Sequence, residues 1–276
     1  MSESALKAFE LLFHLARSGD SSLAKLSRET GWDKATALRY LTAMERRGVV
    51  ERRNGDWTLG LALVELASRV PVSSNIASRA EPILVELARS TGETANLSAL
   101  TGFEIMYVAR AEGGRSLRLR SNPGDRLPLY CTAGGKAVLS RMIQALRTQY
   151  IAEAKLIAYT PHTLIDPVRL TNEIEETIKR GWAIDDEEFE QGLICYALPI
   201  EFPRFGFLGA VSVSGPASRM QHNRNEILAA LRWTVTCLHK EINGSEDENG
   251  EPALFSPGRG GFKSNDWHRP GSEIFE

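Results

Sequence analysis

Five carboxylates precede a cysteine in the segment DDEEFEQGLICYALPI, residues 185–200. Carboxylates near a thiol could bind a metal ion, take part in catalysis, or have no chemical role. The thiol is Cys195, and the acids are Asp185, Asp186, Glu187, Glu188 and Glu190. The first question is therefore which of these three uses the rest of the sequence favours.

The residues around Cys195 favour neither catalysis nor metal binding. Cysteine is among the most buried residue types, and a thiol becomes nucleophilic when a nearby base removes its proton. No histidine is close in the sequence, although His162, His222 and His239 could approach in the fold. Zinc prefers Cys and His ligands at defined spacing, and hard cations need several converging oxygens. We expect no catalytic residue, metal or cofactor, with Asp185 turned toward a pocket and most other acids facing water.

The composition is typical of a globular protein, with 42% hydrophobic and 25% charged residues. No run reaches the roughly 18 apolar residues of a membrane span. The start of the chain has no basic segment before its apolar part, so it lacks the layout of a signal peptide. Cys131, Cys195 and Cys237 are far apart and contain no C-x-x-C pair, which argues against disulfides. We expect a cytoplasmic protein with no membrane partner.

Charge is unevenly distributed along the chain, although the net charge is −2. Residues 34–53 hold six basic and two acidic side chains. A local excess of this kind is one sign of a nucleic-acid surface, but it is also common on solvated helices. The segment 243–276 is acidic, rich in Gly, Ser and Pro, and without periodicity, so we expect a disordered tail.

The first sixty residues predict three helices and a hairpin. ALKAFELLFHLARSG predicts a helix that ends at Gly19, with its apolar residues at Leu6, Phe9, Leu12, Phe13 and Ala16. SSLAKLSRETG forms a second helix capped by Ser21 or Ser22. Asp33 caps a third helix that stops at Gly48. Asn54-Gly55 predicts a two-residue turn between VVER and DWTL. This order is that of a winged helix-turn-helix, whose third helix enters the major groove of DNA.

The third helix has two distinct faces at 100° per residue. Its apolar face carries Ala37, Leu38, Leu41 and Met44. Small and basic residues lie opposite, and they could approach phosphates and base edges. We expect DNA contacts from Lys34, Ala35, Thr36, Arg39, Tyr40 and Arg46 of the helix and from Arg52 and Arg53 of the hairpin. The alternative is a plain three-helix subdomain with a solvated basic face.

An amphipathic helix over 59–70 is expected to follow, with Leu59, Leu63, Leu66 and Val70 in one stripe. It could act as a lever or dimer contact, or simply pack on one domain. Beyond it, mixed helices and antiparallel strands predict an α+β domain. The expected helices cover 75–90, 134–146, 166–180 and 219–241, and the expected strands cover 94–100, 103–110, 116–121, 194–202 and 205–215. We place domain limits at 1–59, 60–73, 74–242 and 243–276.

The motifs GWDKATALRYLTAMERRGVVE, WTLG, LPLYCTAGGKAVLS, GWAIDDEEFEQGLICYALPI and FLGAVSVSGPASRM occur in this order. Together they resemble the IclR family of bacterial transcriptional regulators, from about residue 4 to 241. The resemblance implies an N-terminal domain that binds double-stranded operator DNA and a GAF-like C-terminal domain that binds a small organic acid. It also implies a homodimer or homotetramer that controls a catabolic operon.

The resemblance assigns the effector pocket to three segments. Its expected residues are Ala133, Gly134, Asp185, Cys195, Ser212 and Ser214. Two positions depart from the family pattern, because Tyr130 stands where a histidine is common and Ala35 replaces a usual serine. The nearby aromatic residues slightly favour an aromatic or bulky acid.

Elementary chemistry also supports this pocket. The N–H groups at a glycine-led helix start near residue 134 could bind an anion. Ser212 and Ser214 are two apart on a strand, so both point to the same side. The alternative is that these serines face solvent while Val211 and Val213 pack inward. Two other functions stay open at this point: an enzyme using Cys195, and a DNA-binding protein that responds to no ligand.

Overall fold

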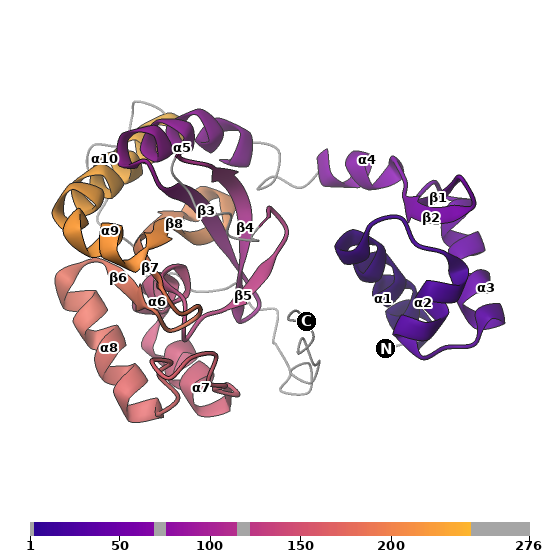
Figure 1. Ribbon diagram of the computed structural model, residues 1–276, viewed down its shortest axis with the longest axis horizontal. Helices are drawn as coiled ribbons and strands as arrows, with labels where there is room; N and C mark the ends of the chain where they lie inside the picture. The colour runs from indigo at the N-terminus through magenta and orange to yellow at the C-terminus, as the bar shows by residue number, and fades with distance from the viewer. Residues whose placement is uncertain (1–2, 69–75, 115–121, 244–276) are drawn as a thin grey trace. The chain divides into compact units, whose positions relative to one another are not determined.

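The computed structural model describes residues 3–68, 76–114 and 122–243. The chain divides into two compact units, Met1–Asn75 and Ile76–Glu276, which are described separately (Figure 1). The predicted strand at 116–121 and the predicted tail lie outside the described residues, apart from Asn243, which ends a helix. No described helix has the length and apolar character needed to cross a membrane.

The N-terminal unit is a winged helix-turn-helix, as predicted. Its elements are α1 (Glu3–Ser18), α2 (Leu23–Thr30), α3 (Lys34–Glu45), β1 (Val50–Arg53), β2 (Asp56–Leu59) and α4 (Ala62–Ser68). Ser22 caps α2 and Asp33 caps α3, each by accepting a backbone N–H three residues later. Asn54 and Gly55 both have positive φ, which the tight turn between β1 and β2 requires. Local sequence signals therefore define this unit well.

The core of this unit differs from the prediction for α1. Leu11 and Leu15 are buried against Leu26, Leu41 and Trp57. Phe9 and Phe13, which belong to the predicted apolar set, are more than half exposed. An apolar helix with hydrophobic residues on several sides does not identify its buried face from spacing alone.

The fourth helix is also shorter than predicted. Leu59 is the last residue of β2, and α4 begins at Ala62. Gly60 separates them, and a side chain there would meet the backbone oxygen of Gly48 at 2.1 Å. The Gly60 N–H donates to the Val49 carbonyl at 2.9 Å, so Gly60 continues the pairing of the hairpin and the helix begins after it. The end of the predicted helix, including Val70, lies outside the described residues.

The C-terminal unit is built on a six-stranded antiparallel sheet in the order β5-β4-β3-β8-β7-β6. The strands are β3 (Thr94–Thr101), β4 (Glu104–Ala111), β5 (Arg126–Pro128), β6 (Ala183–Asp186), β7 (Leu193–Phe202) and β8 (Phe207–Pro216). The helices are α5 (Ala77–Thr91), α6 (Ala133–Arg141), α7 (Gln144–Glu153), α8 (Pro167–Arg180), α9 (Ala217–His222) and α10 (Arg224–Asn243), with the short 3₁₀ turn η2 (Pro203–Phe205) between β7 and β8. This is the predicted α+β class.

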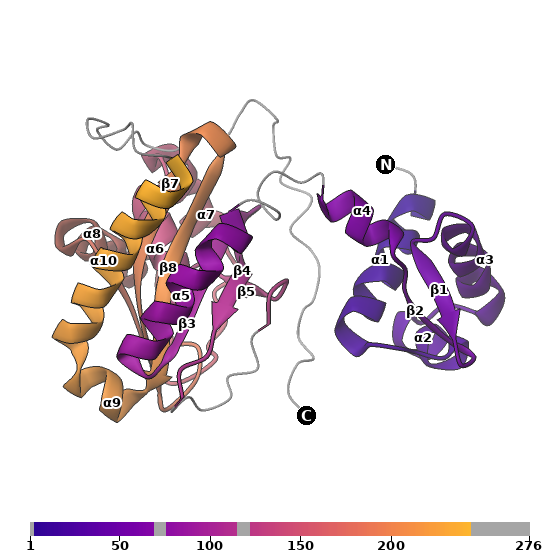
Figure 2. The same ribbon diagram turned by 90° about the horizontal axis from the view of Figure 1, so that it is seen from above.

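Helices cover both faces of the sheet. Figure 2 shows α5 and α10 on one face and α6, α7 and α8 on the other. Alternation along β8 explains the two layers, because Val211 and Val213 point to one side and Ser212 and Ser214 to the other. All four are buried, so the alternative in which the serines face solvent is wrong.

Two predicted helices are each divided in the structure. The helix expected from residue 134 ends at Arg141, where extended Met142 turns its buried side chain into the core before α7 begins. The closing helix splits at Asn223 into α9 and α10. The short strands β5 and β6 are additional elements that the sequence pattern did not predict.

Candidate functional site

The first candidate surface is the exposed face of α3. Ala37 and Leu41 are buried and Leu38 and Met44 pack on the same core, as expected. Solvent reaches the opposite face, which carries Lys34, Ala35, Arg39, Ala43 and Arg46. Small residues beside basic ones leave room for a DNA backbone to approach this face.

Two predicted contacts on α3 have partners within the protein. The Thr36 hydroxyl donates to Asp33 Oδ2 at 2.7 Å, and the Thr36 N–H donates to Asp33 Oδ1 at 2.9 Å. These hydrogen bonds lower the pKa of Asp33, and they place Thr36 in the helix cap. The Arg39 guanidinium lies 5.1 Å from the centre of the Tyr40 ring, which in turn contacts Trp32. Tyr40 therefore helps to orient Arg39.

The hairpin places two arginines at its exposed end. Arg52 lies over the ring of buried Trp57 at 4.5 Å, and Arg53 forms a 2.8 Å ion pair with Glu51. Both arginines are exposed. Cation–π contact holds the first side chain in place, whereas the exposed ion pair of the second is weak and can be exchanged for a phosphate.

The second candidate site is a band of polar residues on the sheet. Direct cross-strand partners share one face of a sheet. One row joins Asp185, Cys195, Ser214 and Thr94, and the next joins Ala183, Ala197, Ser212, Asn96 and Arg110. We call the side that carries these rows the polar face. Four of the six predicted effector residues therefore lie together on it.

The remaining two effector residues lie at the start of α6, which covers the polar face. Gly134 approaches the sheet so closely that a side chain there would lie 3.2 Å from Ser98 Oγ and 3.8 Å from Ala210 Cβ. Thr132 caps the helix by accepting the Gly135 N–H at 3.1 Å. Ala133 and Gly134 are buried, so the helix start is not the exposed anion site expected from the sequence.

Asp185 is buried at the edge of the polar face. Its Oδ1 accepts the backbone N–H groups of Glu188 at 2.8 Å and Phe189 at 3.2 Å. Burial raises the pKa of Asp185 to about 7, while Lys136 opposes the rise and Glu188 adds to it. This carboxyl can therefore carry a proton near neutral pH.

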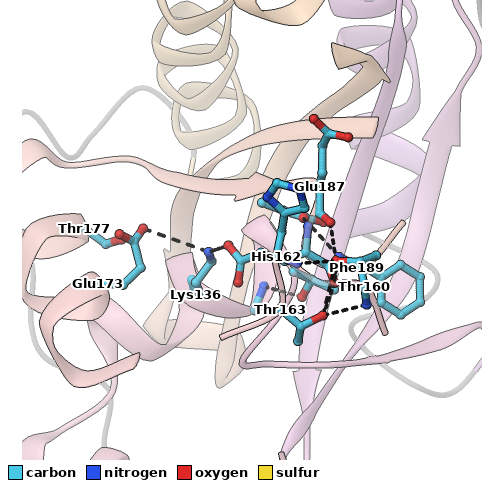
Figure 3. Close-up of polar contacts among 12 residues, drawn as sticks. Lys136, Thr160, His162, Thr163, Glu173, Thr177, Glu187 and Phe189 are labelled. Carbon is cyan, nitrogen blue, oxygen red and sulfur yellow. Dashed lines mark hydrogen bonds and ion pairs between the residues drawn. The ribbon is translucent and has the colours of Figure 1, made fainter. Parts of the chain in front are cut away.

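A buried ion pair lies close to Asp185. Lys136 of α6 is fully buried and pairs with Glu188 Oε1, and its Nζ lies 4.0 Å from Glu173 Oε1 on α8 (Figure 3). Arg180 pairs with the same Glu173 oxygen at 2.6 Å. Burial raises the pKa of Glu188, while Lys136 opposes that rise. The network links α6 and α8 to residues 185–190, which we call the acidic turn.

The segment 157–163 holds the acidic turn from the other side. Thr160 Oγ1 donates to the Glu187 carbonyl at 2.6 Å, and Thr163 Oγ1 donates to the Glu188 carbonyl at 2.6 Å (Figure 3). The Tyr159 and Phe189 rings lie 5.0 Å apart. The expectation that most of the acids face water holds for Asp186 and Glu190, whereas Glu187 is partly exposed and Glu188 is buried.

Tyr130, which departs from the family pattern, belongs to the same support. Its hydroxyl donates to the Ile157 carbonyl at 2.8 Å and accepts the Ile157 N–H at 2.9 Å. The ring is buried. Tyr130 thus anchors the 157–163 segment through its hydroxyl.

Cys195 has the environment of an unreactive thiol. Burial raises its pKa to about 12, Asp185 adds to the rise, and the hydroxyls of Ser212 and Ser214 partly offset it. His239 packs against Phe202 on the α10 side of the sheet, away from Cys195. Among the described residues, no group of three or more acids, cysteines or histidines has the arrangement of a metal site.

An open groove of about 390 Å³ lies elsewhere on this unit. It is lined by Trp182, Arg224, Asn225, Leu228 and Arg232. None of the predicted effector residues lines it. The polar face holds buried polar groups, whereas the groove's arginines are open to water.

Comparison with protein families identifies the family of this chain. The model described as the IclR helix-turn-helix domain matches residues 4–54, and that of the bacterial transcriptional regulator IclR C-terminal matches residues 69–238. The chain belongs to the IclR family. It is a DNA-binding regulator of transcription, and the resemblance seen in its motifs is confirmed.

Characterised relatives of this IclR-family regulator match over most of their length. The acetate operon repressor of Salmonella typhimurium is 31% identical over 234 residues, which cover 83% of this chain and 85% of the relative. The regulator BhcR of Paracoccus denitrificans is 32% identical over 240 residues, which cover 86% and 85%.

Solved structures share the same fold. IclR of Thermotoga maritima is 30% identical, with a TM-score of 0.69 over 88% of this chain and 99% of that one. An IclR homolog from Microbacterium hydrocarbonoxydans, crystallised with 4-hydroxybenzoate, has a TM-score of 0.77 over 87% and 99%. At 20% identity, the second comparison shows the fold alone.

Sequence reasoning missed the residues of β3 and the buried lysine. Thr94, Asn96 and Ser98 alternate with Ala95 and Leu97, and this period of two predicts a polar side of the strand. A polar side of a strand usually faces solvent, so this pattern was visible in the sequence but did not indicate a buried site. Lys136 carried no signal, because lysines are rarely fully buried.

Proposed function

We propose that this regulator senses a small organic acid on the polar face and thereby controls a catabolic operon. The observation that carries the proposal is the concentration of buried hydroxyl, amide and carboxyl groups on one side of a sheet. Asn96, Ser212 and Ser214 are each at most 8% exposed. Buried polar groups are costly unless they are hydrogen-bonded, so a band of them favours a ligand site.

The position of the ligand follows from the same groups. Ser212 and Ser214 can donate two hydrogen bonds to a carboxylate, and the buried start of α6 lies above them at Ala133 and Gly134. Asp185 and Cys195 complete the predicted set on the other side of Ser214. The bound 4-hydroxybenzoate of the Microbacterium homolog supports aromatic acids as the first probes.

DNA recognition is assigned to α3 and the hairpin. Lys34, Ala35, Arg39 and Arg46 are exposed on α3, and Arg52 and Arg53 are exposed on the hairpin. We expect α3 in the major groove, with a homodimer or homotetramer matching a pseudo-palindromic operator. Thr36 belongs to the cap of α3 and Tyr40 orients Arg39, so both stabilise this surface. Thr36 also keeps lone pairs that can accept a hydrogen bond from a base.

The ligand acts by shifting an equilibrium between placements of the DNA-binding units. It can shift that equilibrium only as far as its affinities for the two placements differ. Catalysis is not part of the proposal, because the protonated Cys195 thiol is a poor nucleophile. The regulator is expected to work in the cytoplasm, where bacterial DNA is found.

The first experiment is a thermal-shift screen of the purified protein against aromatic and aliphatic carboxylic acids. A ligand at 100 times its dissociation constant stabilises the folded state by ~2.7 kcal/mol. Hits should lose affinity in the Ser212→Ala/Ser214→Ala variant, and they should change the mobility shift of operator DNA. A screen without hits, together with unchanged operator binding in every acid, would support a regulator that responds to no ligand.

A further inference from the structure

Two side chains of β3 on the polar face each have one buried polar atom without a hydrogen-bond partner among the described residues. They are Asn96, at its Oδ1 atom, and Thr94, at its Oγ1 atom. Asn96 is 1% exposed and Thr94 is 0% exposed. Native proteins satisfy the great majority of buried polar atoms, so two such atoms on one strand of a ligand-site candidate call for an explanation.

Both side chains lie next to the serines proposed to hold the ligand carboxylate. Asn96 is the direct cross-strand partner of Ser212, and Thr94 is that of Ser214. Asn96 Nδ2 also lies 3.4 Å from Ser214 Oγ, the acceptor of its hydrogen bond. A ligand group that reaches Asn96 Oδ1 must therefore be close to the carboxylate itself.

We propose that Asn96 and Thr94 form a hydroxyl-recognition subsite, and that the effector is an acid with its hydroxyl on the carbon beside the carboxyl group. This inference rests on the proposed function, because it assumes an acid held by Ser212 and Ser214. It adds the strand β3 to the site and narrows the effector to 2-hydroxy acids.

The chemistry of the amide selects a hydroxyl. Asn96 Oδ1 accepts hydrogen bonds only, so the ligand must donate one. If the amide is turned about its axis, the nitrogen takes that place and requires an acceptor. A hydroxyl both donates and accepts, so it satisfies either orientation, and its remaining bond can be made with Thr94 Oγ1.

A third polar residue on the strand provides an internal comparison. Ser98 lies two residues beyond Asn96 on the same side, but its hydroxyl already donates to the Ala210 carbonyl at 3.3 Å. Its hydrogen bond is made within the sheet. Ser98→Ala should therefore leave recognition of a ligand hydroxyl unchanged, which makes it a matched control.

The test is isothermal titration calorimetry on the full chain with sets of acids that differ in one hydroxyl. The sets are lactate, 3-hydroxypropionate and propionate, and mandelate and phenylacetate. In any set that binds, the acid with the adjacent hydroxyl should bind at least about tenfold more tightly than the acid without it, since its absence leaves a buried polar group unpaired.

Variants then assign that preference to β3. Asn96→Ala should remove it, Thr94→Val should reduce it with almost no change of shape, and Ser98→Ala should keep it. Circular dichroism checks that each variant folds. If Asn96→Ala does not fold, the result with Thr94→Val decides. Equal binding with and without the hydroxyl, preference for a distant hydroxyl, or a preference that survives both variants would overturn the inference. Failure of the wild type to bind any of these acids, or others in the wider screen, would instead overturn the proposed function.

Discussion

The two candidate sites use polar side chains in opposite ways. On α3 and the hairpin, charged groups such as Arg39 and Arg53 are exposed and keep contact with water. On the polar face, Asn96 and Asp185 are buried beneath α6, and Lys136 of that helix is buried as well. The first surface can meet a large partner without rearrangement, whereas a ligand of the second would have to match its buried polar atoms one by one.

This difference predicts how each site responds to mutation. An exposed charge contributes little to folding, so its removal should change binding alone. A buried charge is compensated by named partners, so its removal should change folding as well.

Removing the buried lysine should have the largest effect. Lys136→Met leaves Glu188 buried without its cation, which should lower the free energy of unfolding of the C-terminal unit by about 3–5 kcal/mol. Urea denaturation measures the loss. The double variant Lys136→Met/Glu188→Leu should recover most of it, and Lys179→Met, which breaks the exposed pair with Glu176, should cause no measurable change. A small effect of Lys136→Met would show that the pair is not buried as described.

Asp185 should make stability depend on pH. Its folded pKa is raised from 3.8 to about 7, so between these values the folded state holds a proton that the unfolded state has released. Stability from this group therefore falls as pH rises toward 7 and is constant above it. Between pH 5 and pH 8, the free energy of unfolding of the Asp185→Asn variant should fall by roughly 2–3 kcal/mol less than that of the wild type. Parallel pH profiles for the two proteins would contradict the assignment.

Removing Arg39 should affect DNA binding alone. Arg39→Ala should weaken specific binding by about 1–3 kcal/mol, and the melting temperature should stay within error. A mobility-shift titration can use DNA selected by the wild-type protein from a random pool. Arg89→Ala, an exposed arginine of the C-terminal unit, is the control and should bind as the wild type does. Equal loss in both variants would indicate a general charge effect.

The smallest effect compares a capping hydrogen bond in the two settings. Ser22→Ala removes the exposed cap of α2, and Thr132→Ala removes the buried cap of α6. The first change should cost about 0.5–1 kcal/mol and the second about 1–2 kcal/mol, since a buried N–H cannot turn to water. If the two losses are equal, burial does not distinguish the sites at this scale.

The sequence predicted local elements better than buried faces. Caps at Ser22 and Asp33 and the Asn54-Gly55 turn were found because each depends on neighbouring residues. The exposure of Phe9 was missed because it depends on how α1 packs against other elements. The short strand β6 was missed for the same reason, since its identity comes from pairing with β7.

The candidate sites show the same limit. Family motifs led to Asp185, Cys195, Ser212 and Ser214, and the sheet places these four on one face. The bond of Thr36 to Asp33 was not predicted, because it depends on the cap geometry. Asn96 was missed because an alternating polar strand gives no sign of being covered on both sides.

The pairing of β3 with β8 sets the order in which the chain can become functional during synthesis. Asn96 and Ser214 are separated by 118 residues, so the polar face cannot close until β8 has left the ribosome. The helices and hairpin of the N-terminal unit make contacts among neighbours and can form much earlier. At typical rates of synthesis the interval is on the order of ten seconds. A chain that stops growing in this interval would carry the DNA-binding surface without the polar face on which the ligand site is proposed.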